Sequence, residues 1–198
     1  MRVWARLPWW GHALAIWAAS RVVSTGILVT FAAAQPANVY TGASPSFVDF
    51  STIWDARWYE HVATHGYPDV LPRDASGSIA DNAWAFMPVY PMLVRALVRL
   101  GLDWQLAALG IAWVASAAFA VLAYRLLRET IPRHAGFALA LVLLGPVSPL
   151  LQVAYAESLH LALLAGALLA LRHRRWGMLA ALVPLMALTR PSGLAFAL

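Results

Sequence analysis

Long apolar stretches alternate with short polar segments along the chain. Five of them have roughly the 17–25 residues that a helix needs to cross a bilayer. They cover residues 10–34, 106–126, 135–151, 155–171 and 177–198. Tryptophans stand at the ends of several stretches, as is typical of a membrane interface: Trp9, Trp10, Trp104 and Trp176. The pattern predicts an all-α, polytopic transmembrane helical bundle, with about five spans in residues 1–198.

The composition supports a membrane location. Hydrophobic residues make up 62% of the 198 positions and charged residues 12%, against about 45–50% and about 25% in soluble domains. The mean hydropathy is +0.67. A soluble core of this size cannot bury so much apolar surface, so the composition excludes soluble globular and disordered proteins. The chain has no cysteine and therefore no disulfide.

The arginines predict which side of the membrane each segment faces. All 14 basic residues are arginine, and they are scattered between apolar stretches, so we expect no nucleic-acid partner. Three groups flank the first, second and fourth stretches: Arg2 and Arg6; Arg125, Arg128 and Arg133; Arg172, Arg174 and Arg175. If these ends are cytoplasmic, the positive-inside rule holds throughout. The N-terminus is then cytoplasmic, and segment 35–103 is a large first external loop.

The first and last stretches each leave a choice. The first follows Arg2 and Arg6 as a signal peptide would, but it exceeds the usual apolar length of about 7–15 residues and contains Arg21. We interpret it as an uncleaved anchor, with Arg21 snorkelling toward the cytoplasm rather than serving a site. The last stretch reaches Leu198 without a polar flank. We therefore expect one transmembrane domain that continues beyond residue 198.

Segment 86–103 is apolar but short. Pro88 and Pro91 stand at its start, and Arg95 and Arg99 share one helical face at a spacing of four. A crossing here would invert the sidedness of all later arginine groups. We therefore interpret the segment as an amphipathic helix that lies on the external interface.

The centre of the external loop carries the chemistry. A helix is predicted from about Thr52 to His65, ended by Gly66. Its positions i, i+3, i+4 and i+7 place one carboxylate on an otherwise apolar face: Asp55, Trp58, Tyr59 and Val62. Such a carboxylate is a candidate general base. The alternative is an interfacial helix whose aspartate is simply solvated.

Four motifs resemble those of bacterial relatives of glycosylphosphatidylinositol mannosyltransferase II, the PIG-V-like family of GT-C membrane glycosyltransferases. They occur in the family order, although Met87, Val89 and Ala156 depart from its pattern. The motifs are Trp54-Asp55-Ala56 to Tyr67, Ala85-Phe86-Met87-Pro88-Val89-Tyr90-Pro91, Tyr155-Ala156-Glu157-Ser158-Leu159 and Thr189-Arg190-Pro191-Ser192-Gly193.

The resemblance implies an enzyme of the bacterial plasma membrane, a mannosyltransferase or related hexosyltransferase. It would move a sugar from a polyprenyl-phosphate donor to a hydroxyl acceptor on the non-cytoplasmic face, with inversion. Asp55 would be the catalytic base. The leaving phosphate needs a cation, and arginine matches its oxygens; Arg190 is the first candidate, and Arg95 and Arg99 are the second. The predicted supporting residues are Trp54, Trp58, Tyr59, Tyr90, Glu157 and Ser158.

Non-catalytic roles are the alternatives for several of these residues. Arg190 would snorkel or pair with another span, and Arg95 and Arg99 would attract lipid headgroups. Glu157 would be a carboxylate that favours a helix start. Tyr90 would be an interface aromatic.

Metal and transport functions are the remaining alternatives. His61 and His65 have the i, i+4 spacing of metal ligands, but no third ligand is evident and the segment is not H-E-x-x-H. We therefore expect no cofactor, with a divalent metal as the alternative. A transporter or flippase of a lipid-linked sugar, or a non-catalytic membrane subunit, would also suit the hydropathy. The enzyme hypothesis requires Asp55 and Arg190 to face one cavity.

Overall fold

The computed structural model describes residues 7–196. This part of the chain contains eight α-helices and no β-strand, so the predicted all-α class is confirmed for it. Two helices are long and apolar enough to cross a membrane: α1 (Trp9–Ala34) and α5 (Trp104–Thr130). They match the first two predicted spans. Arg2 and Arg6, which entered the predicted sidedness, lie outside the described residues.

Helix α5 is the centre of the bundle. Its start is fixed by Asp103, whose carboxylate accepts hydrogen bonds from the backbone N–H groups of Gln105 (2.9 Å) and Leu106 (3.2 Å). The helix then packs against α1 and against three other helices: α4 (Val89–Arg99), α6 (Ala135–Leu144) and α7 (Glu157–Arg172).

The last three predicted spans differ from the helices observed. Helix α6 has 10 residues and ends before Gly145 and Pro146, where the chain enters the 3-10 helix η3 (Ser148–Gln152). Helix α7 has 16 residues, and α8 (Trp176–Ala187) has 12. Each falls short of the roughly 17 residues that a straight crossing needs.

A continuous helix over 177–198 is wrong for the described residues. Helix α8 ends at Ala187, and a 3-10 helix, η4 (Pro191–Phe196), follows a short turn. The physical reason is Pro191, because a proline disfavours the helical conformation of the residue before it. Arg190 therefore lies in a turn and not along a membrane helix.

Arg21 does not snorkel, contrary to the prediction. Its side chain is 2% exposed, and its guanidinium donates hydrogen bonds to the backbone carbonyls of Ser148 (3.0 Å) and Leu143 (3.3 Å). These carbonyls flank the break between α6 and η3. The last turn of a helix leaves carbonyls such as that of Leu143 without intrahelical partners, and the arginine of α1 supplies a donor to it.

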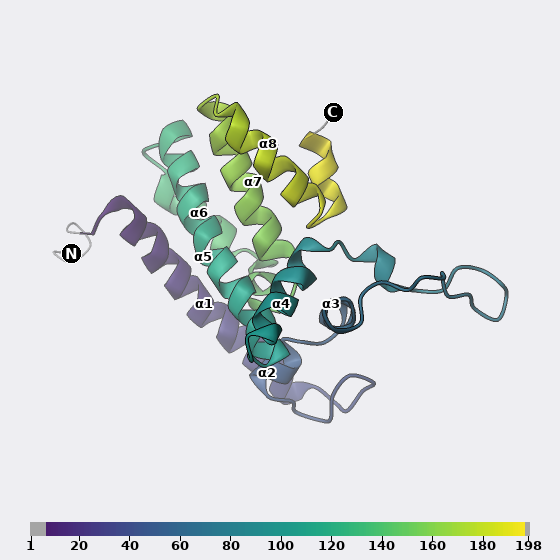
Figure 1. The fold of residues 1–198 in the computed structure, drawn as a ribbon. Helices are drawn as coiled ribbons and strands as arrows, with labels where there is room; N and C mark the ends of the chain where they lie inside the picture. Colours follow the sequence, from purple (N-terminus) through teal and green to yellow (C-terminus); the bar gives the residue numbers. More distant parts are fainter. Residues whose placement is uncertain (1–6, 197–198) are drawn as a thin grey trace.

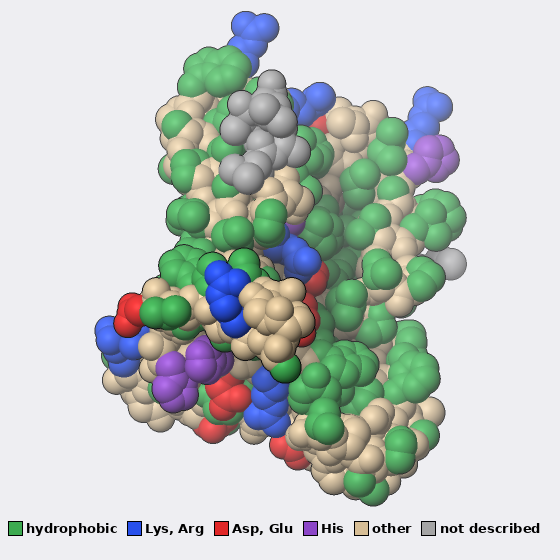
Figure 2. All heavy atoms as spheres, turned by 90° about the vertical axis from the view of Figure 1, so that its right-hand side faces the viewer, with side chains coloured by type: hydrophobic (Ala, Val, Ile, Leu, Met, Phe, Trp, Pro, Cys, Tyr) green, Lys and Arg blue, Asp and Glu red, His purple; other side chains and the backbone are tan. Residues whose placement is uncertain are grey.

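The loop and the arginine groups lie at opposite ends of the molecule (Figure 1). The start of α1, the end of α5, the start of α6 and the turn between α7 and α8 lie at one end, and residues 35–103 lie at the other. Most of the acidic side chains seen on the face drawn in Figure 2 lie in its lower half, over the loop. This arrangement is what the predicted sidedness requires.

The loop is itself helical. It contains α2 (Phe47–Phe50), α3 (Asp55–Thr64), the 3-10 helix η2 (Ala83–Ala85) and α4. Helix α4 has 11 residues, about 16 Å at 1.5 Å per residue, so it is too short to cross a bilayer. It packs against α3 and α5, which agrees with an interfacial helix. The segment between α3 and η2 projects as an arm (Figure 1).

Candidate functional site

Helix α3 begins at the candidate base itself. It starts at Asp55, three residues later than predicted, because Trp54 adopts φ +53° and ψ −119°. A positive φ is rare for a residue with a side chain and stores strain of about 1–3 kcal/mol. The Trp54 side chain is 56% exposed, so its own packing does not offset this cost. Such strain often occurs at functional sites.

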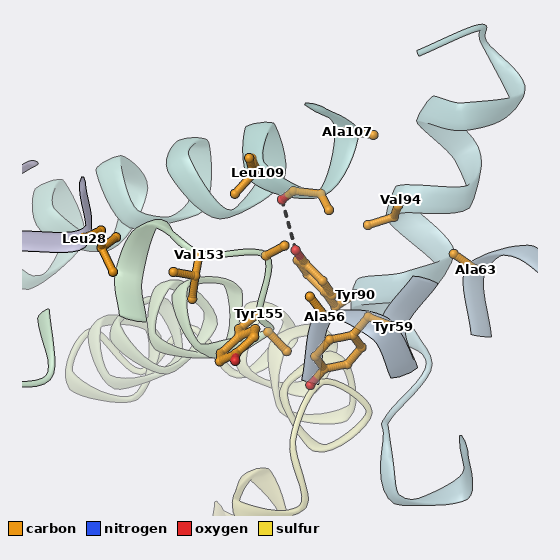
Figure 3. Close-up of a cluster of buried hydrophobic side chains, with 13 residues drawn as sticks. Leu28, Ala56, Tyr59, Ala63, Tyr90, Val94, Ala107, Leu109, Val153 and Tyr155 are labelled. Atoms are coloured by element: carbon orange, nitrogen blue, oxygen red, sulfur yellow. Dashed lines mark hydrogen bonds between the residues drawn. The ribbon is translucent and has the colours of Figure 1, made fainter. Parts of the chain in front are cut away.

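Aromatic rings hold α3 in place. The Tyr59 ring meets Tyr90 edge-on with 4.9 Å between centroids and Phe86 at 5.1 Å, while Trp58 stacks on Phe86 at 5.8 Å. The buried Tyr90 hydroxyl donates a hydrogen bond to the Ala108 carbonyl of α5 at 2.9 Å (Figure 3). Trp58, Tyr59 and Tyr90 thus join α3, α4 and α5. On the predicted apolar face, Tyr59 and Val62 are buried and Asp55 is half-buried.

Glu157 and Arg190 form an ion pair. Glu157 is the first residue of α7, and Arg190 lies in the turn between α8 and η4. Arg190 Nη1 donates to Glu157 Oε1. The second carboxylate oxygen of Glu157 is buried and has no hydrogen-bond partner within residues 7–196. Arg190 therefore pairs with a residue of another helix, which is one of the two non-catalytic roles predicted for it.

Gly193 fixes the turn that carries Arg190. A Cβ atom at this position would lie 2.4 Å from the backbone nitrogen of Ala187 and 2.5 Å from the carbonyl carbon of Met186. Only glycine allows so close an approach of two backbone segments. The glycine of the fourth motif is therefore explained by packing, because the chain doubles back on the end of α8.

Two tyrosines lie within electrostatic reach of both Asp55 and the ion pair. Burial raises the pKa of both Tyr59 and Tyr155, and the carboxylates of Asp55 and Glu157 raise them further. Arg190 acts on Tyr59 in the opposite direction. The Tyr155 hydroxyl donates to the Ile53 carbonyl at 3.4 Å, next to the start of α3. The charges of all three predicted ionisable residues thus reach Tyr59, and those of the two carboxylates also reach Tyr155.

Three other predicted residues lie outside this cluster. Arg95 and Arg99 are five and nine residues beyond Tyr90 on α4, about 8 and 14 Å along the helix. Neither makes a hydrogen bond or ion pair within the described part of the chain. Ser158 is buried and donates to the Leu151 carbonyl at 2.9 Å, so it supports the start of α7.

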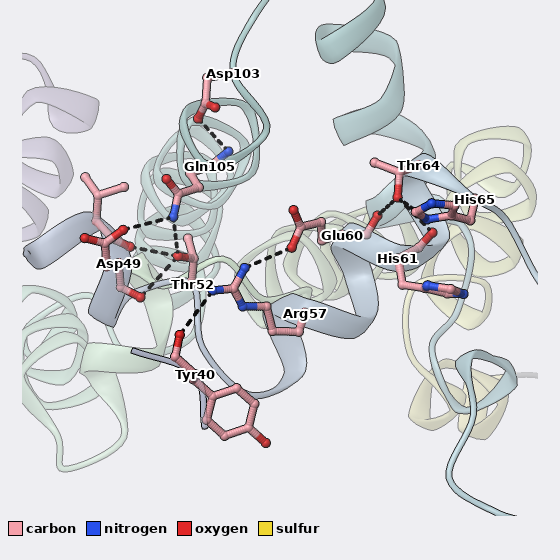
Figure 4. A network of polar contacts seen from close by, with 11 residues as sticks. Tyr40, Asp49, Thr52, Arg57, Glu60, His61, Thr64, His65, Asp103 and Gln105 are labelled. Atoms are coloured by element: carbon pink, nitrogen blue, oxygen red, sulfur yellow. Dashed lines mark hydrogen bonds and ion pairs between the residues drawn. The ribbon is translucent and has the colours of Figure 1, made fainter. Parts of the chain in front are cut away.

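A polar network that the sequence did not predict lies beside α3 (Figure 4). Arg57 donates to Glu60 Oε2 (3.1 Å) and to the Tyr40 carbonyl (3.4 Å). The Gln105 amide donates to Thr52 Oγ1 at 2.9 Å, which links α5 to the chain just before α3. The i, i+3 spacing of Arg57 and Glu60 was the one local signal for it. The Tyr40 and Gln105 contacts depend on the fold.

The two histidines of α3 stack at 5.0 Å between ring centroids. His65 Nδ1 lies 2.7 Å from Thr64 Oγ1. Residues 7–196 contain no group of three or more histidine, cysteine or carboxylate side chains placed to hold a metal ion.

An apolar groove of about 440 Å³ runs between α4, α5 and α7. Only apolar residues line it, among them Leu93, Leu97, Ile111 and Val114. Leu159, also in the lining, is two residues from Glu157. The groove therefore reaches the first turn of α7, the helix that begins at Glu157.

No protein-family model, no curated protein and no solved structure matches this chain.

Proposed function

We propose that this protein is a polytopic membrane glycosyltransferase of the GT-C type. It would transfer a sugar, which the sequence resemblance suggests is mannose, from a polyprenyl-phosphate donor to a hydroxyl acceptor on the non-cytoplasmic face. The observation that carries the proposal is the convergence of Asp55, Glu157 and Arg190 on Tyr59 and Tyr155. Segments far apart in the sequence thereby bring a carboxylate and an arginine to one place.

The proposed reaction divides the roles between these groups. Asp55 takes the proton of the acceptor hydroxyl while the acceptor oxygen bonds to the anomeric carbon. The bond from that carbon to the phosphate oxygen breaks, and its electron pair leaves with the polyprenyl phosphate. Arg190 neutralises the leaving phosphate. Attack opposite the leaving group inverts the anomeric carbon.

The apolar groove supports a lipid-linked donor. A polyprenyl chain needs an apolar path, and the groove between α4, α5 and α7 offers one that reaches the first turn of α7. Arg95 and Arg99 on α4 would attract the anionic interface rather than contact the reacting phosphate.

Substitution of Asp55 tests the base. Asp55→Asn should lower sugar transfer from a radiolabelled polyprenyl-phosphate-sugar by about 10²–10⁴-fold, because general base catalysis contributes that much. Donor binding should persist. The matched control is Asp69→Asn in the exposed arm, which should leave transfer unchanged. Full turnover in Asp55→Asn would refute the assignment.

The same pair of measurements separates an enzyme from a transporter. The break between α6 and η3, bonded to Arg21, is a feature that transporters also use. A transporter would bind and move the lipid-linked sugar without cleaving it. Transfer of the labelled sugar, lost in Asp55→Asn with donor binding retained, would favour the enzyme.

Cysteine labelling tests the proposed sidedness. The chain has no cysteine, so single cysteines can be placed at exposed Val70, Leu102 and Arg133. Positions 70 and 102 should react with an impermeant reagent from outside the cell, and position 133 only after the membrane is opened. The reverse pattern would place Asp55 in the cytosol and end the proposal.

A further inference from the structure

A basic pocket lies at the end of the molecule opposite Asp55. It has a volume of about 630 Å³ and lies between the start of α1 and the end of α5. Its lining consists of Trp9, Arg125, Arg128, Glu129 and Pro132. The proposed transfer reaction uses none of these residues.

The pocket carries an excess of positive charge. Glu129 is its single carboxylate and is already shared by three groups: Arg125 Nε (3.4 Å), Arg172 Nε (2.9 Å) and His173 Nε2 (3.1 Å). The Arg128 guanidinium lies 5.8 Å from the centre of the Trp9 ring. Within residues 7–196 it makes no hydrogen bond or ion pair. Its planar set of donors is therefore available to an anion.

The pocket also lies where lipid headgroups would be. Trp9 and Trp10 begin α1 and are 36% and 50% exposed, as is typical of tryptophans at a membrane interface. Both helices beside the pocket are long and apolar enough to cross a membrane. An anion held by Arg128 would have apolar helix surface next to it for acyl chains.

We propose that this pocket binds the headgroup phosphate of an anionic phospholipid in the leaflet on the arginine-rich side. Arg128 and Arg125 contact the phosphate oxygens, and Trp9 covers the neighbouring part of the headgroup. A lipid, rather than free phosphate, is the occupant because the pocket lies between two candidate spans. The inference rests on the membrane insertion proposed above and is independent of sugar transfer.

The test compares two single arginine variants of the full chain. Arg128→Gln removes a pocket arginine that makes no hydrogen bond in the described part, so folding should survive. Arg133→Gln removes an exposed arginine at the same end and is the matched control. Each protein is titrated with phosphatidylglycerol or phosphatidylcholine in mixed micelles, and bound lipid is counted by native mass spectrometry.

Phosphatidylglycerol should bind at least about tenfold more weakly to Arg128→Gln than to the unmodified protein, the equivalent of about one charge-assisted hydrogen bond. Arg133→Gln should change its affinity less than about twofold. Equal loss in both variants would show general attraction to charge and overturn the site. Equal binding of phosphatidylcholine, or full displacement by millimolar inorganic phosphate, would also overturn it. Asp55→Asn should bind the lipid normally, so a failed glycosyltransferase assay would leave this result unaffected.

Discussion

The guanidinium of Arg190 pairs with the carboxylate of Glu157, 33 residues away in the chain, and ties the turn after α8 to the first residue of α7. The carboxylates of Glu157 and Asp55 both raise the pKa of Tyr59 and of Tyr155, so the two tyrosines lie within electrostatic reach of both. A phosphate that binds Arg190 must therefore share it with Glu157. If the proposed donor phosphate binds Arg190, this competition would let Glu157 set how strongly Arg190 holds it.

Removing either partner of this pair should lower the free energy of unfolding. Each single change should cost more than half of what removing both partners costs. We expect Glu157→Gln to lower the free energy of unfolding by about 1–2 kcal/mol, because it leaves Arg190 half-buried without its carboxylate. The Arg190→Gln change should cost a similar amount. The double variant should cost less than the sum of the two, as a double-mutant cycle of unfolding in detergent would show. Strict additivity would mean that the two side chains do not interact.

Glycine should suit position 54 better than alanine. Trp54 has φ +53°, which glycine adopts freely and alanine does not, so Trp54→Gly should be more stable than Trp54→Ala by about 1 kcal/mol. At exposed His61 inside α3, the same two substitutions should rank in the opposite order, because glycine costs about 0.5–1 kcal/mol in a helix. Thermal unfolding of the four variants measures both differences. The same order at both sites would exclude backbone strain at Trp54.

The turn that carries Arg190 should not tolerate a methyl group. Gly193→Ala places Cβ 2.4 Å from the backbone of Ala187, so we expect a loss of about 1–3 kcal/mol in stability and weaker donor binding through a displaced Arg190. At Gly26 nothing lies within 4 Å of the added Cβ, and Gly26→Ala should stabilise α1 by about 0.5–1 kcal/mol. Denaturation curves and donor titrations check both. An unperturbed Gly193→Ala protein would contradict the close approach.

Stability should fall as the pH rises above about 10, the ordinary tyrosine pKa. Burial raises the folded-state pKa of Tyr59 and Tyr155, and the carboxylates of Asp55 and Glu157 raise them further. Above that pH the unfolded chain has lost these protons while the folded chain keeps them, so unfolding becomes more favourable. Each tyrosine contributes about 1.4 kcal/mol per pH unit.

Phenylalanine variants isolate this effect. Tyr59→Phe and Tyr155→Phe should each flatten the fall in the free energy of unfolding at alkaline pH. Neither should change the tyrosinate absorbance of the folded protein just above pH 10, because these hydroxyls stay protonated there. A drop in native tyrosinate absorbance at that pH would show that the rings titrate freely.

Local sequence patterns were enough to predict the helices that depend on nearby residues. The apolar stretches of α1 and α5, the short helix around Arg95 and the helix after Trp54 all follow from periodicity and from end signals. Hydropathy did not show that the stretches starting at 135 and 177 break into shorter helices. Hydropathy sums apolar residues and is insensitive to the breaks at Pro146 and Pro191.

The sequence alone determined that the chain is helical and apolar and that arginines and carboxylates segregate along it, and it singled out Asp55, Glu157 and Arg190 as candidate site residues. Only the tertiary structure decided that Arg190 pairs with Glu157, that Arg21 bonds to the broken end of α6, and that Tyr59 and Tyr155 lie between the charges. Helix formation is governed by residues three or four positions apart. These contacts join residues tens to more than a hundred positions apart, and the packing of α1 on α6 and of α8 on α7 brings them together.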